Sequence, residues 1–288
     1  MKRMENAEYI ALVLVLAGIA FAVLHWERVV GVVDAIVHHT EQATAPTPPA
    51  SPPAAQASGS LLPKPTASAP AKLQLPASTA SLPALAHSDR FAAHAIGALV
   101  GHEAFARWFL PRSLLEHIVS TIDNLARRHV PVSHWPLRPT PGALRVRSDG
   151  TQVWIADDNA QRYAPYVAML RRVDPAALVR TYLQLYPLLQ QAWRELGYPH
   201  GQFNDRLLAV LANLLAAPQP AAPVALTQPH VLYLYADPAL EAASSGQKIL
   251  IRIGPHNEAA VKQWLRQVQT DLRRHLVPAP HESTASGD

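Results

Sequence analysis

A proline- and alanine-rich stretch from residue 41 to residue 83 limits what this chain can fold into. The stretch holds ten prolines, including two adjacent pairs, and almost no charge. It cannot bury enough apolar surface to offset the entropy of ordering it, so we expect a disordered or locally polyproline-like linker. The polar tail at residues 278–288 is also expected to be disordered. The remaining segment, residues 84–277, is long enough for one folded domain.

An uninterrupted apolar run near the N-terminus has the length and flanks of a transmembrane helix. The run covers residues 10–24, and Tyr9 and Trp26 lie at its ends, where an aromatic belt would sit. Lys2 and Arg3 precede it, whereas the charges on its far side nearly balance. Because positive charge stays on the cytoplasmic side, this asymmetry predicts a cytoplasmic N-terminus and an exported C-terminal domain.

We therefore expect residues 1–8 in the cytoplasm and a helix over residues 9–26 as the contact with the lipid bilayer. Two alternatives stay open: a cleaved signal peptide with a weak site at Ala20 and Ala22, and a buried core helix. Residues 27–40 carry apolar side chains at a spacing of three to four and predict a juxtamembrane helix. Its apolar face could pair two copies into a homodimer or lie against lipid headgroups.

Residues 84–277 are mildly basic and rich in arginine. They hold 20 Arg and Lys against 14 Asp and Glu, a net charge of +6. Such a surface attracts anionic partners, and arginine pairs bidentately with carboxylate or phosphate. The arginines are spread along many segments instead of forming one stripe, so no nucleic-acid partner is expected. The chain has no cysteine, which excludes disulfides, thiolate nucleophiles and cysteine-ligated zinc.

Helix-start signals, each followed by apolar residues at helical spacing, predict a mainly α domain. The expected N-caps are Ser88, Ser113 with Glu116 as a capping box, Asp174 before Pro175, Asn204, Asp237 before Pro238, Ser244 with Gln247 as a second capping box, and Asn257. Gly101 and Gly197 are expected to end helices, and Pro187 to kink or break the helix that contains it. Residues 249–253 fit a short helix or a buried strand, and we favour the helix.

One β element is expected, at residues 144–155. Apolar and polar residues alternate there around Ser148-Asp149-Gly150, and Asp-Gly supplies the positive φ of a hairpin turn. An isolated hairpin is marginally stable in water, so it must pack on helices. The predicted fold class is mainly α: a helical domain with a small β-hairpin, preceded by a single transmembrane helix and a disordered Pro/Ala-rich linker.

Catalytic signatures are largely missing from the sequence. It contains no glycine-rich phosphate loop, no nucleophile elbow and no paired-histidine zinc helix. His102-Glu103 begins like a zinc-protease motif, but the second histidine is absent. Ser245 and Lys248 have the Ser-x-x-Lys spacing of penicillin-binding proteins without the partner motifs, which favours a chance match. We therefore assign no catalytic residue, no metal ligand and no cofactor.

Two stretches are dense enough in polar groups to form a binding site. One runs from Asp123 to Arg128, and the other from Glu195 to Arg206. The candidate binding residues are Asp123, Asn124, Arg127, Arg128, Glu195, Tyr198, Asn204, Asp205, Arg206 and Lys248. Helix caps and surface ion pairs use the same residue types, so a purely structural role is the competing interpretation.

The same stretches resemble an uncharacterised bacterial family, domain of unknown function 3014, over about residues 84–274. The resembling residues are Asp123-Asn124-Leu125-Ala126-Arg127-Arg128, Pro141-Gly142, Tyr186-Pro187-Leu188, Glu195-Leu196-Gly197-Tyr198-Pro199, Phe203-Asn204-Asp205-Arg206-Leu207, Ala236-Asp237-Pro238 and Gly246-Gln247-Lys248. The resemblance implies a Gram-negative envelope protein with an N-terminal membrane helix and a Pro/Ala-rich linker, and nothing finer. It implies no activity or ligand.

Two functions of different classes follow. The first is a non-enzymatic envelope module that binds a protein or an anionic polymer through an arginine-bearing surface. The alternative is a hydrolase or lyase acting on an envelope polymer, with Glu195 and Asp205 as acid and base. The missing motifs and the basic charge favour the binding module.

Overall fold

The computed structural model describes residues 73–75, 82–128, 136–138, 143–229 and 232–276. The expected transmembrane and juxtamembrane helices, most of the expected linker, and the tail lie outside these residues. Within the described part, no helix combines the length and apolar character needed to cross a membrane.

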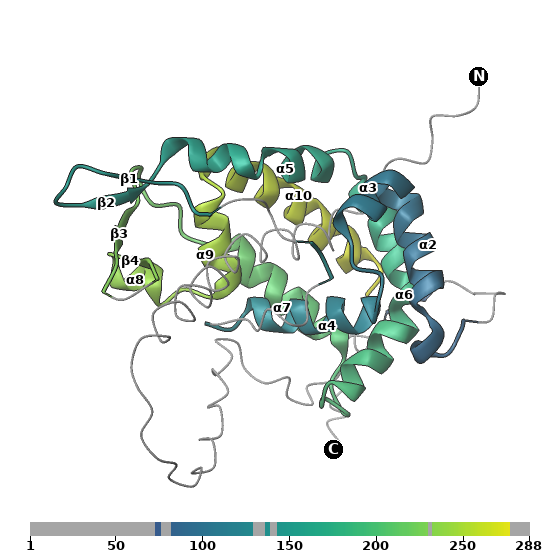
Figure 1. Cartoon of the computed structure of the whole chain (residues 1–288). Coiled ribbons are helices and arrows are strands. Elements are labelled where there is room, and N and C mark those ends of the chain that lie inside the picture. The colour runs from purple at the N-terminus through teal and green to yellow at the C-terminus, as the bar shows by residue number, and fades with distance from the viewer. Residues whose placement is uncertain (1–72, 76–81, 129–135, 139–142, 230–231, 277–288) are drawn as a thin grey trace, which may run out of the picture.

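The described chain is mainly helical with one small sheet. The elements are η1 (Leu85–His87), α2 (Asp89–Val100), α3 (His102–Trp108), α4 (Leu114–Leu125), β1 (Val146–Ser148), β2 (Val153–Ile155), η3 (Asp157–Arg162), α5 (Ala164–Leu170), α6 (Pro175–Glu195), α7 (Phe203–Leu215), β3 (Ala225–Thr227), β4 (Leu234–Tyr235), α8 (Pro238–Glu241), α9 (Ser245–Arg252) and α10 (Pro255–Arg274). The sheet lies at one end of the molecule, and α2, α3 and α6 lie at the other (Figure 1).

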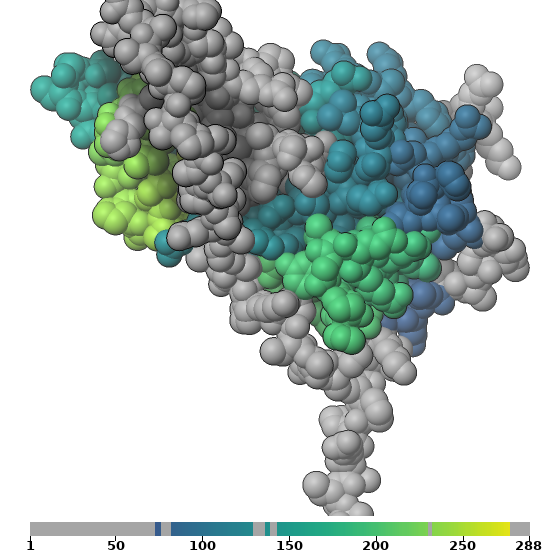
Figure 2. All heavy atoms as spheres, turned by 60° about the horizontal axis from the view of Figure 1, so that its bottom comes forward, coloured from purple at the N-terminus to yellow at the C-terminus, as the bar shows by residue number. Residues whose placement is uncertain are grey.

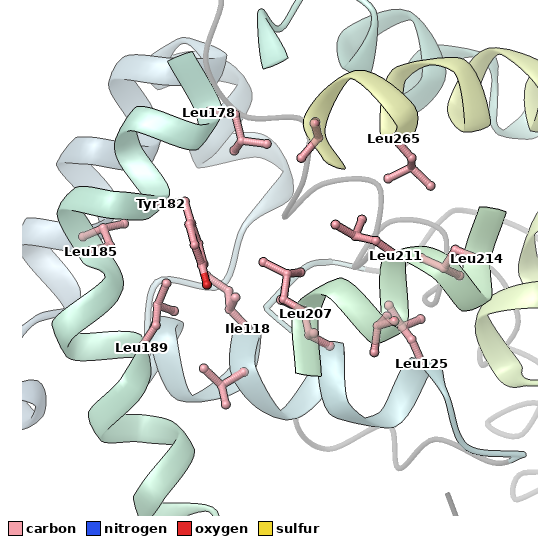
Figure 3. Packing of buried hydrophobic residues seen from close by; sticks show 14 of the residues in the cluster. Ile118, Leu125, Leu178, Tyr182, Leu185, Leu189, Leu207, Leu211, Leu214 and Leu265 are labelled. Atoms are coloured by element: carbon pink, nitrogen blue, oxygen red, sulfur yellow. The ribbon is translucent and has the colours of Figure 1, made fainter. Parts of the chain in front are cut away.

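The core lies where α4, α6, α7 and α10 pack together. Each helix contributes a stripe of leucine, isoleucine or valine at the helical spacing, and these stripes face one another (Figure 3). Ile118 of α4, Leu207 of α7 and Leu265 of α10 are all at most 3 % exposed. Burial of these faces is the main driving force for folding. The predicted helical domain is thus confirmed.

The predicted hairpin is confirmed but belongs to a larger sheet. β1 pairs with β2, β2 with β3, and β3 with β4, all antiparallel. Leu226 and Tyr235 of this sheet pack against Leu240 of α8 and Ile251 of α9. On the face in Figure 2 the teal hairpin projects beside the yellow-green surface of this region. The prediction missed β3 and β4 because these strands are short and, unlike β1 and β2, are not joined by an Asp-Gly turn.

Four of the predicted N-caps are wrong, although each helix forms. Ser88 precedes α2 but makes no side-chain cap hydrogen bond. Ser113 makes no cap hydrogen bond and has φ 47°; instead, both carboxylate oxygens of Asp89 accept from the backbone N–H groups of Ser113 and Leu114, at 2.9 and 2.8 Å. The helix expected to begin after Asn204 begins at Phe203, whose N–H donates to Gln190 Oε1 at 2.9 Å. These two caps come from other helices.

The fourth wrong cap is Asn257, which lies inside the first turn of α10. Gly254 precedes that helix, and the Asn257 amide donates to the carbonyls of Ala160 and Ile253. By contrast, the Asp174 and Asp237 caps and the Ser244–Gln247 capping box are confirmed. Residues 249–253 are helical up to Arg252, as favoured above.

Pro187 does not break its helix, contrary to one of the expected outcomes. α6 continues through it from Pro175 to Glu195 and ends before Gly197, which has φ 109°. The flanking residues Tyr186 and Leu188 are both buried, so tertiary packing holds this helix together where one backbone hydrogen bond is lost.

The start of the described chain lies against its end. Leu73 forms an antiparallel bridge with Leu276, and the Gln74 N–H donates to the His275 carbonyl at 2.8 Å. The chain therefore enters and leaves the domain at one place, beside the C-terminus of α10.

Candidate functional site

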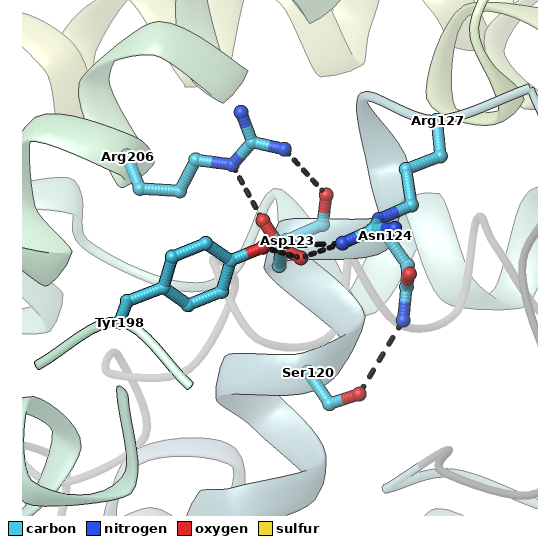
Figure 4. A network of polar contacts seen from close by, with 6 residues as sticks. All are labelled: Ser120, Asp123, Asn124, Arg127, Tyr198 and Arg206. Carbon is cyan, nitrogen blue, oxygen red and sulfur yellow. Dashed lines mark hydrogen bonds and ion pairs between the residues drawn. The ribbon is translucent and has the colours of Figure 1, made fainter. Parts of the chain in front are cut away.

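A buried carboxylate, Asp123, is the centre of the candidate site. It lies near the C-terminal end of α4, and its side chain is 3 % exposed. Side chains from three segments converge on it (Figure 4). A buried charge is tolerated only when it is paired and hydrogen-bonded, so its partners determine whether the cluster is stable.

Arg206 of α7 is the first partner. Its Nε lies 2.7 Å from Asp123 Oδ1, and its Nη2 donates to the Asp123 backbone carbonyl at 2.9 Å. The Arg206 side chain is only 2 % exposed. One guanidinium thus neutralises the carboxylate and also satisfies a carbonyl in the last turn of α4, where a cation is favoured by the helix dipole.

Arg127 and Tyr198 complete the cluster. Arg127 Nη2 donates to Asp123 Oδ2 at 2.7 Å and to the Tyr198 hydroxyl oxygen at 3.1 Å, and this hydroxyl donates to Asp123 Oδ2 at 3.1 Å. The Tyr198 ring is held by stacking on Trp193, with ring centroids 3.8 Å apart. The pKa of Tyr198 is raised most by its partial burial and next by the charge of Asp123. The phenol therefore stays protonated and remains a donor.

The cluster carries more positive than negative charge. Two guanidinium groups share one carboxylate. Although burial lowers the pKa of Arg127, the hydrogen bond and charge of Asp123 outweigh it and the net shift is upward. The Arg127 side chain is 24 % exposed, and its buried Nε has no acceptor among the described residues. Arg128 follows directly and is exposed. The surplus charge therefore reaches the surface at these two arginines.

The cluster also positions helix α9. The Ser245 N–H donates to the Arg127 carbonyl at 2.7 Å, and Gly246 lies so close that an added Cβ would be 3.1 Å from the Leu125 carbonyl oxygen. Asn213 of α7 accepts from Ser244 and, through its carbonyl, from Gln247. The resembling stretches around residues 123, 198, 206 and 246 therefore meet at one place in the fold.

The remaining predicted residues lie apart from this centre or serve other contacts. Asn124 donates to Ser120 at 3.3 Å, and Asn204 accepts a hydrogen bond of 3.3 Å from Tyr182. The Lys248 ammonium contacts the Glu241 carboxylate, which accounts for that lysine without an activated serine.

Glu195 and Asp205, the alternative acid and base, occupy different settings. Glu195 is exposed and accepts from Gln191 at 3.0 Å. Asp205 is half-buried, and desolvation raises its pKa. They share no hydrogen-bond partner within the described residues.

No trio of His, Asp or Glu side chains in the described part of the chain is placed to hold a metal ion. The rings of His94 and His102 are in contact, with centroids 5.9 Å apart.

With this geometry in view, comparison with known proteins identifies the domain. A family model described as a protein of unknown function (DUF3014) matches residues 114–269, more than half of the chain. The chain belongs to this family. The resemblance expected from the sequence is thus confirmed. No curated protein and no solved structure matches the chain.

The DUF3014 match begins at the first residue of α4 and ends within α10. It therefore contains the whole Asp123 cluster but omits Asp89, the residue that caps α4. Sequence reasoning missed both Asp89 and Trp193 as supports of the site. No local pattern identifies Asp89, because its partners lie more than 20 residues along the chain, and Trp193 has the spacing of an ordinary core residue.

Proposed function

We propose that this DUF3014 protein is a single-pass envelope protein whose helical domain binds a protein or an anionic envelope component. Residues 9–26 anchor it in the inner membrane, and the domain lies in the periplasm. The spacer lies within residues 41–83, of which Leu73 and Gln74 pair with the end of the domain. The apolar run and its flanking charges support the anchor. Residues 27–40 add a helix through which two copies could pair.

The charge surplus at Asp123 is the observation that carries the binding proposal. Asp123 Oδ1 pairs with Arg206, and Asp123 Oδ2 accepts hydrogen bonds from both Arg127 and Tyr198. Arg127 therefore shares this carboxylate oxygen with Tyr198. The Arg127 guanidinium, which already donates to Asp123 and Tyr198, is 24 % exposed, and a carboxylate or phosphate from a partner would accept from its remaining N–H groups. Arg128 adds an exposed cation at the same end of α4. The alternative enzymatic function has no comparable observation in its favour.

The binding proposal is tested by charge reversal at the exposed arginine. Arg128→Glu is compared with wild type and with the matched control Arg194→Glu, which reverses another exposed arginine outside the cluster. Full-length protein is solubilised from membranes, and the amounts of bound protein and anionic polymer are quantified at low and high salt. We expect Arg128→Glu to reduce a salt-sensitive partner about tenfold while Arg194→Glu retains it. Identical partner sets for all three proteins would rule out this surface.

Arg206 is unsuitable for such a test because it is buried in the cluster. Its replacement would remove one of the two guanidinium groups that pair with Asp123. It would also leave the Asp123 carbonyl, in the last turn of α4, without its donor. Loss of binding in that variant would report on folding rather than on recognition.

The anchor and its orientation are tested separately. A reporter enzyme active only outside the cytoplasm is fused to the C-terminus, and membranes are fractionated. We expect an active reporter in the membrane fraction, and release into the soluble fraction when residues 1–40 are deleted. A freely soluble full-length chain, or a reporter active only in the cytoplasm, would overturn the proposed topology.

A further inference from the structure

A polar groove lies on the outer side of α10, formed by elements that take no part in the Asp123 cluster. It has a volume of about 360 Å³, toward the lower end of the roughly 300–1,000 Å³ of small-molecule sites. Its lining residues are Arg171, His256, Ala259, Ala260, Gln263, Trp264 and Gln267. All except Arg171 belong to α10, and Arg171 follows the last residue of α5.

The groove is held in shape by a buried contact. Trp264 is 5 % exposed, and its indole N–H donates to the Val173 carbonyl at 3.0 Å. This bond fastens the turn between α5 and α6 onto α10, two residues after Arg171. The arginine is thereby placed beside the helix, and its side chain is exposed.

The polar side chains of the groove are left for a ligand. Gln263 and Gln267 are four residues apart, so they project from one face of α10, and His256 begins the same stripe. Ala259 and Ala260 leave space between them. Among the described residues, none of the side chains of Arg171, His256, Gln263 and Gln267 forms a hydrogen bond or an ion pair. No carboxylate lines the groove, so the Arg171 charge is not neutralised within it.

The chemistry of these groups indicates what they would bind. A primary amide both donates and accepts, as does a sugar hydroxyl, so a pair of glutamines suits a hydroxylated ring. A guanidinium forms bidentate hydrogen bonds with an oxyanion, and a neighbouring imidazole can donate one more. We propose that this groove is a binding site for an anionic sugar, with the glutamines on its hydroxyls and Arg171 on its carboxylate or phosphate.

This site is independent of the surface proposed above, because it uses none of the same residues. The test uses full-length protein in detergent micelles and saturation-transfer NMR, which detects weak ligands through their own ring protons. The probes are glucuronate, glucose 6-phosphate and glucose. They separate a carboxylate from a phosphate, and both from an uncharged sugar.

We expect transfer to at least one anionic sugar and a weaker signal for glucose. Arg171→Ala should weaken the affinity for the anionic sugar about tenfold and leave that for glucose unchanged. Gln263→Ala combined with Gln267→Ala should weaken both. The matched control is Arg172→Ala, which removes the adjacent exposed arginine outside the groove and should have no effect.

Binding of glucuronate alone would assign a carboxylate ligand, and binding of glucose 6-phosphate alone would assign a phosphate ligand. The proposal is overturned if no probe receives saturation, if glucose binds as well as the anionic sugars, or if Arg171→Ala and Arg172→Ala behave alike. Failure here would leave the Arg128→Glu result unaffected, so the two proposals can fail separately.

Discussion

At the scale of single residues, Asp123 is the most consequential side chain of the domain. It compensates the buried guanidinium of Arg206 and part of the charge of Arg127. We predict that Asp123→Asn lowers the free energy of unfolding by about 3–5 kcal/mol, because it leaves a buried cation uncompensated. Asp271→Asn, which breaks an exposed ion pair with Arg274, should cost less than about 1 kcal/mol. Chemical denaturation monitored by circular dichroism measures both. Equal losses would contradict the assigned role.

Asp205 predicts a pH-dependent stability difference. Desolvation raises its pKa above the ordinary value of 3.8, so the folded state binds its proton more tightly than the unfolded state does. The stabilisation that comes from this tighter proton binding is present in full below the pKa of Asp205 in the unfolded state. It is lost as the pH rises through the pKa of Asp205 in the folded state. Asp205→Asn should therefore be more stable than wild type at neutral pH, and the difference should shrink as the pH falls toward about 4. Thermal unfolding at several pH values tests this. A pH-independent difference would refute it.

At the scale of elements, helices of this domain are completed by their neighbours. The first turn of α4 is capped by Asp89 of α2, so Asp89→Ala should cost about 1 kcal/mol or more. Ser113, which stands in the N-cap position with positive φ, contributes no cap bond. Ser113→Gly removes the strain of the left-handed conformation but increases the conformational entropy of the unfolded chain. The two effects on the free energy of unfolding should cancel to within about 0.5 kcal/mol. If Ser113→Gly lowered the free energy of unfolding strongly and Asp89→Ala did not, Ser113 would be the cap of α4, as expected from the sequence.

The contact of α9 with α4 and α7 predicts opposite behaviour of two helical glycines. An alanine Cβ at Gly246 would lie 2.4 Å from the Leu214 side chain and 3.1 Å from the Leu125 backbone carbonyl. We predict that Gly246→Ala destabilises the domain by about 1–3 kcal/mol despite its better helix propensity. Gly97→Ala is the matched control: its obstacle, the exposed His102 ring, can rotate away. Its melting temperature should stay level or rise, and a comparable fall in both variants would contradict the close packing of α9.

At the scale of the whole molecule, the folding unit is larger than the family match. Residues 114–269 omit α2, whose Ile96 and Leu99 are buried in the main core, and the end of α10 with Leu272. We predict that a fragment of residues 82–276 unfolds cooperatively, whereas the fragment 114–269 is mostly unfolded or aggregates, because it leaves core surface uncovered. Calorimetry and amide dispersion in NMR spectra distinguish the two. A well-folded short fragment would show that α2 is dispensable.

The sequence alone indicated the longer helices α2, α4, α6, α7, α9 and α10, but not the seven-residue helices α3 and α5. Apolar spacing, together with Asp174-Pro175, Gly101 and Gly197, is a local property, and local properties decide where a helix can start, which face it buries and where it ends. It also located the hairpin through Asp149-Gly150. These signals depend only on residues that are close together in the sequence, not on the tertiary packing.

Only the tertiary structure decided how these segments support one another. The caps from Asp89 and Gln190, the two short strands added to the hairpin, and the helix that continues through Pro187 all depend on a neighbour brought close by folding. The candidate site is of the same kind, since Arg206 reaches Asp123 across 83 residues of sequence. Periodicity describes one element at a time, whereas the choice of partner depends on how all buried faces are covered together.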